Sequence, residues 1–171
     1  MEERRATWLW RLATSQRDHA GGWEDDKRHG RGVWQHPNGD TYTVEFRNDL
    51  LDGHCHVAYA NGDQYDGDLV EGKKEGSGRF VYSHGMEYEG GWKDDKRHGR
   101  GVWQHPNGDT FMGEFRNDLP HGRCGITYAN DDQYDGYCVE GRKEGVGKYV
   151  RSDGTQFKGD WKNDQRYRIG V

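Results

Sequence analysis

The sequence predicts an all-β protein, a solenoid-like array of 23-residue β-hairpin repeats that forms one long, curved antiparallel sheet with an aromatic-lined groove. The first observation is a near copy: Trp92–Phe111 reads WKDDKRHGRGVWQHPNGDTF and repeats Trp23–Tyr42 at an offset of 69 residues. That offset is three times 23, and a 23-residue pattern runs through most of the chain. Internal periods of this size indicate a repeat architecture.

The second observation is the start of each unit, where an aromatic residue, a glycine and a second aromatic residue occupy alternate positions. Tyr88, Gly90 and Trp92 show the full pattern, and related openings begin at residues 19, 42, 65, 88, 111, 134 and 157. Alternation with period two predicts a β-strand with the aromatic side chains and the glycine on one face. The chain therefore contains six complete units and a seventh that stops early.

The third observation is a glycine pair followed by a turn dipeptide. HGRG at His98–Gly101 precedes a second strand, and Asn107-Gly108 then closes the unit. Asn-Gly is a strong hairpin signal because both residues tolerate positive φ. We expect one hairpin per unit, with about thirteen strands paired in chain order at the usual strand spacing.

The glycine between two aromatic residues calls for a reason, because glycine inside a strand weakens it. We expect a ring on a neighbouring strand to lie across the bare backbone, and we expect the glycines to let the sheet curl. The alternative for any single ring is that it is purely a core side chain, packed only against other rings. For the row as a whole partial exposure is favoured, since no other segment is available to cover it.

Two regions are expected. Residues 1–18 lie outside the repeat and form an N-terminal cap segment, read as a short helix because Trp8, Leu9 and Leu12 have helical spacing. Trp8, Trp10 and Leu12 also alternate, as in a strand. Residues 19–171 form the array. The cap would cover the first strand edge, as terminal units of an array require.

Composition excludes several classes of protein. The net charge of −5 comes from interspersed acids and bases, which argues against a nucleic-acid face. Three cysteines without paired spacing suggest no disulfide framework and a reducing compartment. No apolar run approaches the length of about 18 residues that a membrane span needs. We expect a cytoplasmic protein, either free or associated with the cytoskeleton or a membrane.

Catalytic and metal-binding patterns are weak. His29 and His98 occupy equivalent positions in the repeat, which favours a structural role over a unique catalytic one. His54-Cys55-His56 is the densest metal-like cluster, but adjacent strand residues point to opposite faces. The glycines satisfy no phosphate-binding fingerprint. The sequence therefore predicts no enzyme activity, no cofactor and no metal.

On these residues the chain resembles the MORN (membrane occupation and recognition nexus) repeat proteins, most clearly at Tyr88–Trp103 and Phe111–Ile126. The resemblance runs from Ala20 to the end of the sequence. It implies hairpin-per-repeat sheets that act as protein-interaction scaffolds, and a role in phospholipid binding has been proposed for the family. The departures from the pattern are Val44, Cys55, Leu69, Cys124, Cys138 and the dipeptide Tyr167-Arg168.

We interpret the chain as a non-catalytic scaffold or adaptor that holds a helical or extended partner segment along its aromatic groove. Aromatic side chains suit this role because they offer large, rigid contact surfaces. The predicted partner-binding residues are Trp23, Trp34, Tyr42, Phe46, Tyr65, Tyr88, Trp92, Trp103, Phe111, Phe115, Tyr134 and Trp161.

Two alternatives stay open. One is a peripheral membrane module that binds anionic phospholipid, such as a phosphoinositide, through basic loops. Its candidate residues are Lys27, Arg28, Lys73, Lys74, Lys96, Arg97, Arg142 and Lys143. The other is a targeting domain of a larger enzyme, as in some lipid kinases and lysine methyltransferases with similar repeats. A homodimer through a terminal edge strand is a further expectation.

Overall fold

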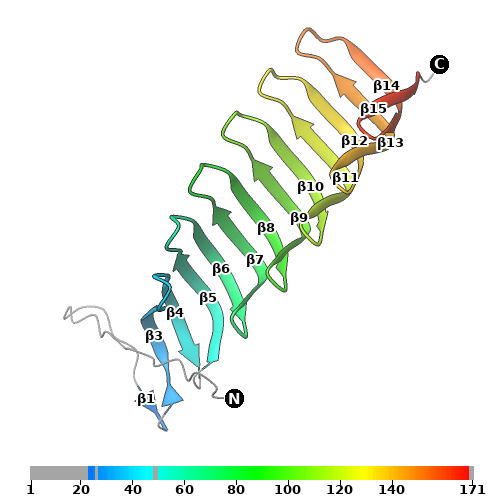
Figure 1. Ribbon diagram of the computed structural model, residues 1–171. Coiled ribbons are helices and arrows are strands. Elements are labelled where there is room, and N and C mark those ends of the chain that lie inside the picture. Colours follow the sequence, from blue (N-terminus) through cyan, green and yellow to red (C-terminus); the bar gives the residue numbers. More distant parts are fainter. Residues whose placement is uncertain (1–22, 26, 48–49, 170–171) are drawn as a thin grey trace, which may run out of the picture.

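The computed structural model describes residues 23–25, 27–47 and 50–169 (Figure 1). The expected N-terminal helix falls on residues 1–18 and so lies outside the described residues. The described residues form strands and turns and include no helix, as the alternating sequence pattern predicts.

Thirteen antiparallel strands, β3 to β15, form one open sheet in chain order, which confirms the predicted architecture. In Figure 1 the hairpins follow one another stepwise along a twisted ribbon. The strands that open a unit are β4 (Thr41–Arg47), β6 (Gln64–Val70), β8 (Glu87–Lys93), β10 (Thr110–Arg116), β12 (Gln133–Val139) and β14 (Gln156–Lys162). The returning strands are β3 (Gly30–Gln35), β5 (Leu50–Ala58), β7 (Lys73–Val81), β9 (Lys96–Gln104), β11 (Leu119–Thr127), β13 (Arg142–Val150) and β15 (Gln165–Ile169). At the N-terminal end, β1 (Trp23–Glu24) and β2 (Lys27–Arg28) pair separately as a two-stranded ribbon.

The two edges of the sheet carry different turns. Where an opening strand meets its returning strand, two residues with positive φ form a tight turn, as at Asp94 (φ 48°) and Asp95 (φ 65°). Such turns match the twist of a hairpin. At the other edge a longer turn ends in a single left-handed glycine, such as Gly108 (φ 99°). The predicted tight turn at Asn-Gly is present, and of its two residues only the glycine takes positive φ, because Asn107 precedes the left-handed position in this turn type.

A bulge bends every complete hairpin at the glycine pair. In β8 and β9, Gly90 pairs with Gly101 while Trp92 pairs with Arg97, so β9 has two extra residues between these pairs. Gly99 lies in this bulge with a φ of 73°. The bulge turns the strand end toward the face that carries the aromatic rings, because Arg97 packs against Trp103 on that face. The first glycine of HGRG therefore makes the bend.

The second glycine of the pair makes room for a ring. A Cβ added at Gly101 would lie 2.5 Å from Tyr88 Oη, so the ring lies against the bare backbone. Tyr88 Oη also donates a hydrogen bond to Gly91 O at 2.9 Å. The covering ring stands two residues before Gly90 on the same strand and reaches across to the partner strand. The expectation of a ring from a neighbouring strand was made for the glycine between two aromatic residues, and it is wrong for Gly90, which lies against a ring of its own strand. The ring over Gly101 does come from the neighbouring strand.

The core is a continuous layer on this one side of the sheet, which we call the ring-bearing face. Its rings meet edge to face, with centroids 5.2 Å apart for Tyr88 and Trp92 and 5.0 Å apart for Tyr88 and Phe115. The buried members are Val44, Phe46, Cys55, Val57, Tyr65, Leu69, Phe80, Tyr88, Trp92, Phe111, Phe115, Cys124, Tyr134, Cys138 and Trp161. Rings and glycines thus replace the aliphatic core that this sequence lacks.

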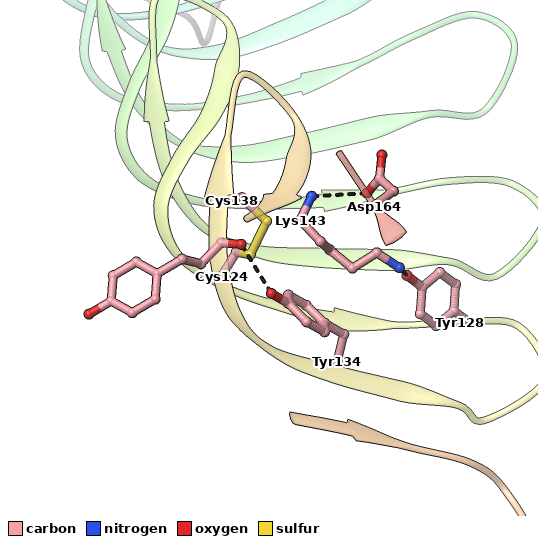
Figure 2. The surroundings of a disulfide bond; sticks show 7 residues. Cys124, Tyr128, Tyr134, Cys138, Lys143 and Asp164 are labelled. Carbon is pink, nitrogen blue, oxygen red and sulfur yellow. Dashed lines mark hydrogen bonds between the residues drawn. A yellow bond between two sulfur atoms is a disulfide. The ribbon is translucent and has the colours of Figure 1, made fainter. Parts of the chain in front are cut away.

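A disulfide joins Cys124 on β11 to Cys138 on β12, with 6.0 Å between their Cα atoms (Figure 2). The expectation of no disulfide is wrong. Cys124 stands where the second glycine of the pair is usual, and Cys138 stands where the second aromatic residue is usual. Strand pairing makes these positions diagonal neighbours, since Cys124 pairs with Gly136. The cysteine count consequently gives no support to a reducing compartment.

Candidate interaction surface

Five aromatic side chains remain partly exposed on the ring-bearing face, and we call them the ring ladder. Each lies in, or directly after, a different returning strand from β5 to β13. They are Tyr59, Tyr82, Trp103, Tyr128 and Tyr149. Two strand spacings separate successive returning strands. The rings themselves are unevenly spaced, because Trp103 and Tyr149 stand two residues earlier in the repeat than Tyr59, Tyr82 and Tyr128.

Buried rings support the ladder from below and between its members. Phe80 has its centroid 5.6 Å from that of Tyr59 and 4.5 Å from that of Tyr82. Tyr128 and Tyr149 lie 6.0 Å apart. The ladder is therefore the outer part of a packed aromatic layer, with rings held in place before any ligand arrives.

Basic side chains near the start of the returning strands, beyond the bulge, lie among the rings. Lys74 Nζ lies 5.9 Å from the centroid of Tyr59 and 5.4 Å from that of Trp92, and Arg97 Cζ lies 4.0 Å from the centroid of Trp103. The Lys74 side chain is 15% exposed and that of Arg97 is 11% exposed. Cation–π attraction of this kind strengthens when the groups are removed from water.

Lys143 repeats this arrangement near the disulfide. Its Nζ donates to Tyr128 Oη at 2.8 Å and lies 5.0 Å from the centroid of Trp161. Its backbone N donates to Asp164 Oδ1, so the residue connects the ring layer to the next turn (Figure 2). In the intervening unit the equivalent position is Pro120, which is buried and carries no charge.

The structure places most of the predicted partner-binding residues in the core. Tyr42 and Trp103 are partly buried, while Trp23 and Trp34 lie on β1 and β3. The buried ones are Phe46, Tyr65, Tyr88, Trp92, Phe111, Phe115, Tyr134 and Trp161. A partner on this face would meet the ring ladder first, and of its five members only Trp103 was among the predicted residues. The alternation of side chains along a strand was the available signal, since Tyr82 is two residues after Phe80 and therefore lies on the same face.

The predicted lipid-contacting residues divide into two sets. Lys74, Arg97 and Lys143 are directed into the rings, as described above. Lys27, Lys73, Lys96 and Arg142 are exposed, and Arg28 lies on β2. Lys73 Nζ lies 2.9 Å from Asp94 Oδ1, and Arg142 Nη1 donates to Asn163 Oδ1. Three of the eight residues are therefore withdrawn from the surface that a membrane would meet.

A row of carboxylates lies beside the ladder at the edge with the longer turns. Asp63 Oδ1 accepts from Ser83 N and Asp109 Oδ1 accepts from Ala129 N, both at 2.8 Å. Asp132 Oδ2 accepts from the hydroxyl of Tyr149, a ladder ring, at 2.7 Å. The Ala129 N–H lowers the pKa of Asp109, and the Tyr149 hydroxyl lowers the pKa of Asp132. Both are thus charged at neutral pH.

The opposite face of the sheet carries an open hollow of about 990 Å³. Charged side chains line it, with acids on opening strands and bases on returning strands, as for Glu89 and Arg100. Met112, which is 61% exposed, is its largest apolar side chain. The side chains pair with one another here, for example Arg79 with Glu87. On this face charged side chains such as Arg79 therefore already have partners within the protein, whereas the ring ladder presents partly exposed rings.

His54 and His56 share this opposite face, while Cys55 between them is buried on the other. Both imidazoles pair with Asp66, at 3.0 Å from His54 Nε2 and 3.4 Å from His56 Nδ1. Among the residues that the structure describes, no three His, Cys, Asp or Glu side chains are grouped so that they could hold a metal ion. The described part of the chain also has no helix of the length and apolarity that crossing a membrane requires.

Comparison with protein families gives a match along almost the whole array. The family model described as MORN repeat matches residues 19–41, 45–64, 65–86, 88–110, 111–133, 134–156 and 157–166. A search of curated proteins gave no match.

Two solved structures have a similar fold. One is the SAS-4 (dCPAP) TCP domain of Drosophila melanogaster in complex with a Proline Rich Motif of Ana2, with a TM-score of 0.52 and 17% identity over 88% of this chain and 86% of that one. The other is the TCP10 domain of Danio rerio CPAP in complex with a peptide of STIL, with a TM-score of 0.51 and 16% identity over 89% of this chain and 64% of that one. At this level of identity the likeness concerns the fold.

Proposed function

Because the chain belongs to the MORN repeat family, we propose that it is a non-catalytic interaction scaffold that binds a segment of a partner protein along the ring ladder. The observation that carries the proposal is the ladder itself, with one partly exposed ring on each of five successive returning strands. Rigid aromatic side chains contribute strongly to binding because little conformational entropy is lost when they are covered.

The support around the ladder favours a preformed site. Phe80 packs against both Tyr59 and Tyr82, and Arg97 packs against Trp103. Rings that are already fixed cost less entropy to immobilise on binding. The two similar structures each hold a peptide, which supports a peptide segment as the kind of ligand proposed for this chain.

Site-specific photo-crosslinking tests the proposal. A benzophenone amino acid replaces Tyr82 on the ring-bearing face in one variant and Met112 on the opposite face in a matched control. After irradiation in an extract of the source cells, we expect one recurring segment of a partner protein to be linked through position 82 and not through position 112. A segment linked through position 112 alone would place binding on the wrong face.

Vesicles provide the second arm of this experiment. Vesicles with anionic lipid are sedimented with the wild type and with Lys96→Glu, a variant at an exposed lysine that begins β9. We expect neither protein to sediment strongly at physiological salt. Strong sedimentation of the wild type that Lys96→Glu abolishes would contradict the scaffold and favour the membrane module.

A further inference from the structure

We propose that Arg97 and Trp103, at the centre of the ring ladder, bind a carboxylate group of the partner segment that an aspartate or glutamate side chain supplies. The inference rests on the proposed function, because it names the chemistry of the partner at the same surface. It depends on two buried donor atoms that lack acceptors, on the contrast with other units of the array, and on the position of the pair in the sheet.

Arg97 and Trp103 each carry a buried donor that no described residue satisfies. The guanidinium of Arg97 donates to Asp118 through Nε, at 3.2 Å from Oδ1, and through Nη2, at 3.0 Å from the backbone O. Its Nη1 and the indole Nε1 of Trp103 are buried and have no hydrogen-bond partner. The two groups are stacked, with Arg97 Cζ 4.0 Å from the ring centroid. Buried donors without acceptors cost stability, so two of them in one contact call for a reason.

Other indole groups of the ring layer do have acceptors. Trp92 Nε1 donates to Gly78 O at 3.0 Å, and Trp161 Nε1 donates to Gly147 O at 3.3 Å. Both bonds end on backbone carbonyl groups of the sheet itself. The fold can therefore satisfy an indole donor from within, and it does not do so for Trp103.

The preceding unit has simpler side chains at the same two repeat positions. Lys74 and Phe80 stand 23 residues before Arg97 and Trp103. Lys74 Nζ lies 3.3 Å from Asp95 Oδ1, and a phenyl ring has no donor to satisfy. The ring layer is thus packed without surplus donors in that unit. Arginine and tryptophan add donors that the packing of the layer does not require.

The donors determine the chemistry of the missing group. A purely apolar or cationic side chain would leave both of them unsatisfied. A guanidinium is planar and always charged, so it matches the two oxygens of an anionic group better than a neutral carbonyl. Asp118 already shares this guanidinium, which favours the single negative charge of a carboxylate over the larger charge of a phosphate. The site therefore selects an aspartate or glutamate of the partner.

The position of the pair suits a binding centre. β9, which carries both residues, is the middle strand of the thirteen in the sheet. Tryptophan and arginine are enriched among the residues that dominate binding energy, and such residues cluster near the centre of an interface. Both side chains are partly exposed, although the two donor atoms are covered. Binding therefore includes a rotation of the Trp103 side chain, a kind of change that is common when interfaces form.

Nuclear magnetic resonance with capped peptides tests the inference. The probes are acetylated and amidated Ala-Ala-Glu-Ala-Ala and the same peptide with glutamine in place of glutamate, added to the isotope-labelled full chain. The indole N–H signal of Trp103, identified by its absence from Trp103→Phe, reports binding. We expect the glutamate peptide to shift this signal with an affinity about tenfold higher than that of the glutamine peptide, because charge-assisted hydrogen bonds are about twice as strong as neutral ones.

Matched variants locate the binding. Arg97→Lys keeps the charge and removes Nη1, so the glutamate peptide should bind about tenfold more weakly to it. The variant should fold, because Lys74 occupies the same repeat position in the preceding unit. Met112→Ala on the opposite face should leave the shift of the Trp103 signal unchanged. Urea unfolding confirms that each variant is folded.

The segment that is crosslinked through position 82 provides a second arm. A synthetic peptide of that segment should contain an aspartate or glutamate whose replacement by asparagine or glutamine weakens binding to the wild type about tenfold. The same replacement should have little effect on binding to the Arg97→Lys/Trp103→Phe double variant, because the donors that recognise the carboxylate are gone. This double variant has the pair found at Lys74 and Phe80.

The outcomes separate the inference from the proposed function. Equal shifts of the Trp103 signal by the two capped peptides, or no shift with either, overturn the inference. A captured segment without such a carboxylate, or with one that matters equally for the wild type and the double variant, overturns it too. In each of these cases crosslinking through position 82 leaves the scaffold standing. Absence of any crosslink through position 82 overturns the scaffold instead.

Discussion

Arg97 and Asp118 clamp two successive hairpins together through a pair of reciprocal contacts. Arg97 N donates to Asp118 Oδ1 at 3.0 Å, and Asp118 N donates to Arg97 O at 3.0 Å. Lys143 and Asp164 repeat the clamp, at 2.9 Å and 3.1 Å. The tight turns are therefore joined from one unit to the next by a carboxylate in a left-handed turn position.

At the turn of Gly141 the clamp is lost by two changes that compensate each other. Pro120 has no N–H to donate, and the position that would accept is Gly141, which has no carboxylate; only the bond from Gly141 N to Pro120 O remains. The other edge has the same kind of break, where Met86 replaces the accepting aspartate and Pro106 replaces the donor. Neither break leaves a polar group of the clamp without its partner.

Asp118→Ala should lower the free energy of unfolding by about 1–2 kcal/mol, because it leaves Arg97 N without its acceptor. Urea unfolding measures the change. Asp118→Asn keeps an acceptor oxygen and should lose less. An alanine variant with the midpoint of the wild type would show that the clamp does not contribute to stability.

Gly101→Ala should destabilise the protein by about 1–3 kcal/mol, because the added Cβ would overlap the Tyr88 ring. Gly125→Ala is a matched control on β11. Its Cβ would have no neighbour closer than 3.9 Å, and no positive φ opposes it. This substitution should be neutral or slightly stabilising. Similar losses of unfolding free energy for both variants would contradict the role of Gly101 in receiving the ring.

The sequence was sufficient for the architecture because every strand repeats the same signal. Alternation of Tyr88, Gly90 and Trp92 predicts a strand and the face of its rings, and strict repetition predicts the order of pairing. Alternation does not predict how far each ring is covered. That depends on the bulge at Gly99, which folds Arg97 over the rings and makes core of residues expected to be surface.

The disulfide depends on a contact that is not local in sequence, and the surroundings of the basic side chains depend on which face of the strand each one occupies. Cys124 and Cys138 are 14 residues apart, and only the register of β11 against β12 makes them neighbours. Lys74 and Lys73 are adjacent and chemically alike, yet one enters the rings and the other faces solvent because strand neighbours point to opposite sides.

Reduction of the disulfide should lower the free energy of unfolding by about 3 kcal/mol, the loop-closure value for a loop of this size. The measurement is urea unfolding with and without a reductant. Wild type should shift to a lower midpoint, whereas a Cys124→Ala/Cys138→Ala double variant should not respond. Cys55 is a free thiol and offers no bond to reduce, so an equal response of both proteins would show that the effect does not come from this disulfide.

Stability should fall as pH rises from 10 toward 12. Burial raises the pKa of Tyr88 from 10.0 to about 12, and burial raises that of Tyr134 to about 12. The folded state thus favours the neutral phenol, so this stabilisation is complete below pH 10 and is lost as pH rises through the folded-state pKa. Urea unfolding at successive pH values measures the loss.

Tyr88→Phe is the control for this pH dependence. It removes the hydroxyl and its bond to Gly91 O, so stability should be lower at pH 8. Between pH 10 and 12 its decline should be shallower than that of the wild type, because one titrating group is gone. Identical slopes would assign the alkaline loss to other groups.

The affinity of the crosslinked partner segment for Tyr82→Ala and Met112→Ala, compared with wild type, tests the central claim most directly. Tyr82 belongs to the ring ladder and Met112 lies in the hollow on the opposite face. The account predicts a loss of about tenfold or more for Tyr82→Ala and an unchanged affinity for Met112→Ala, with both variants folded. Unchanged affinity for Tyr82→Ala together with a loss for Met112→Ala would contradict it.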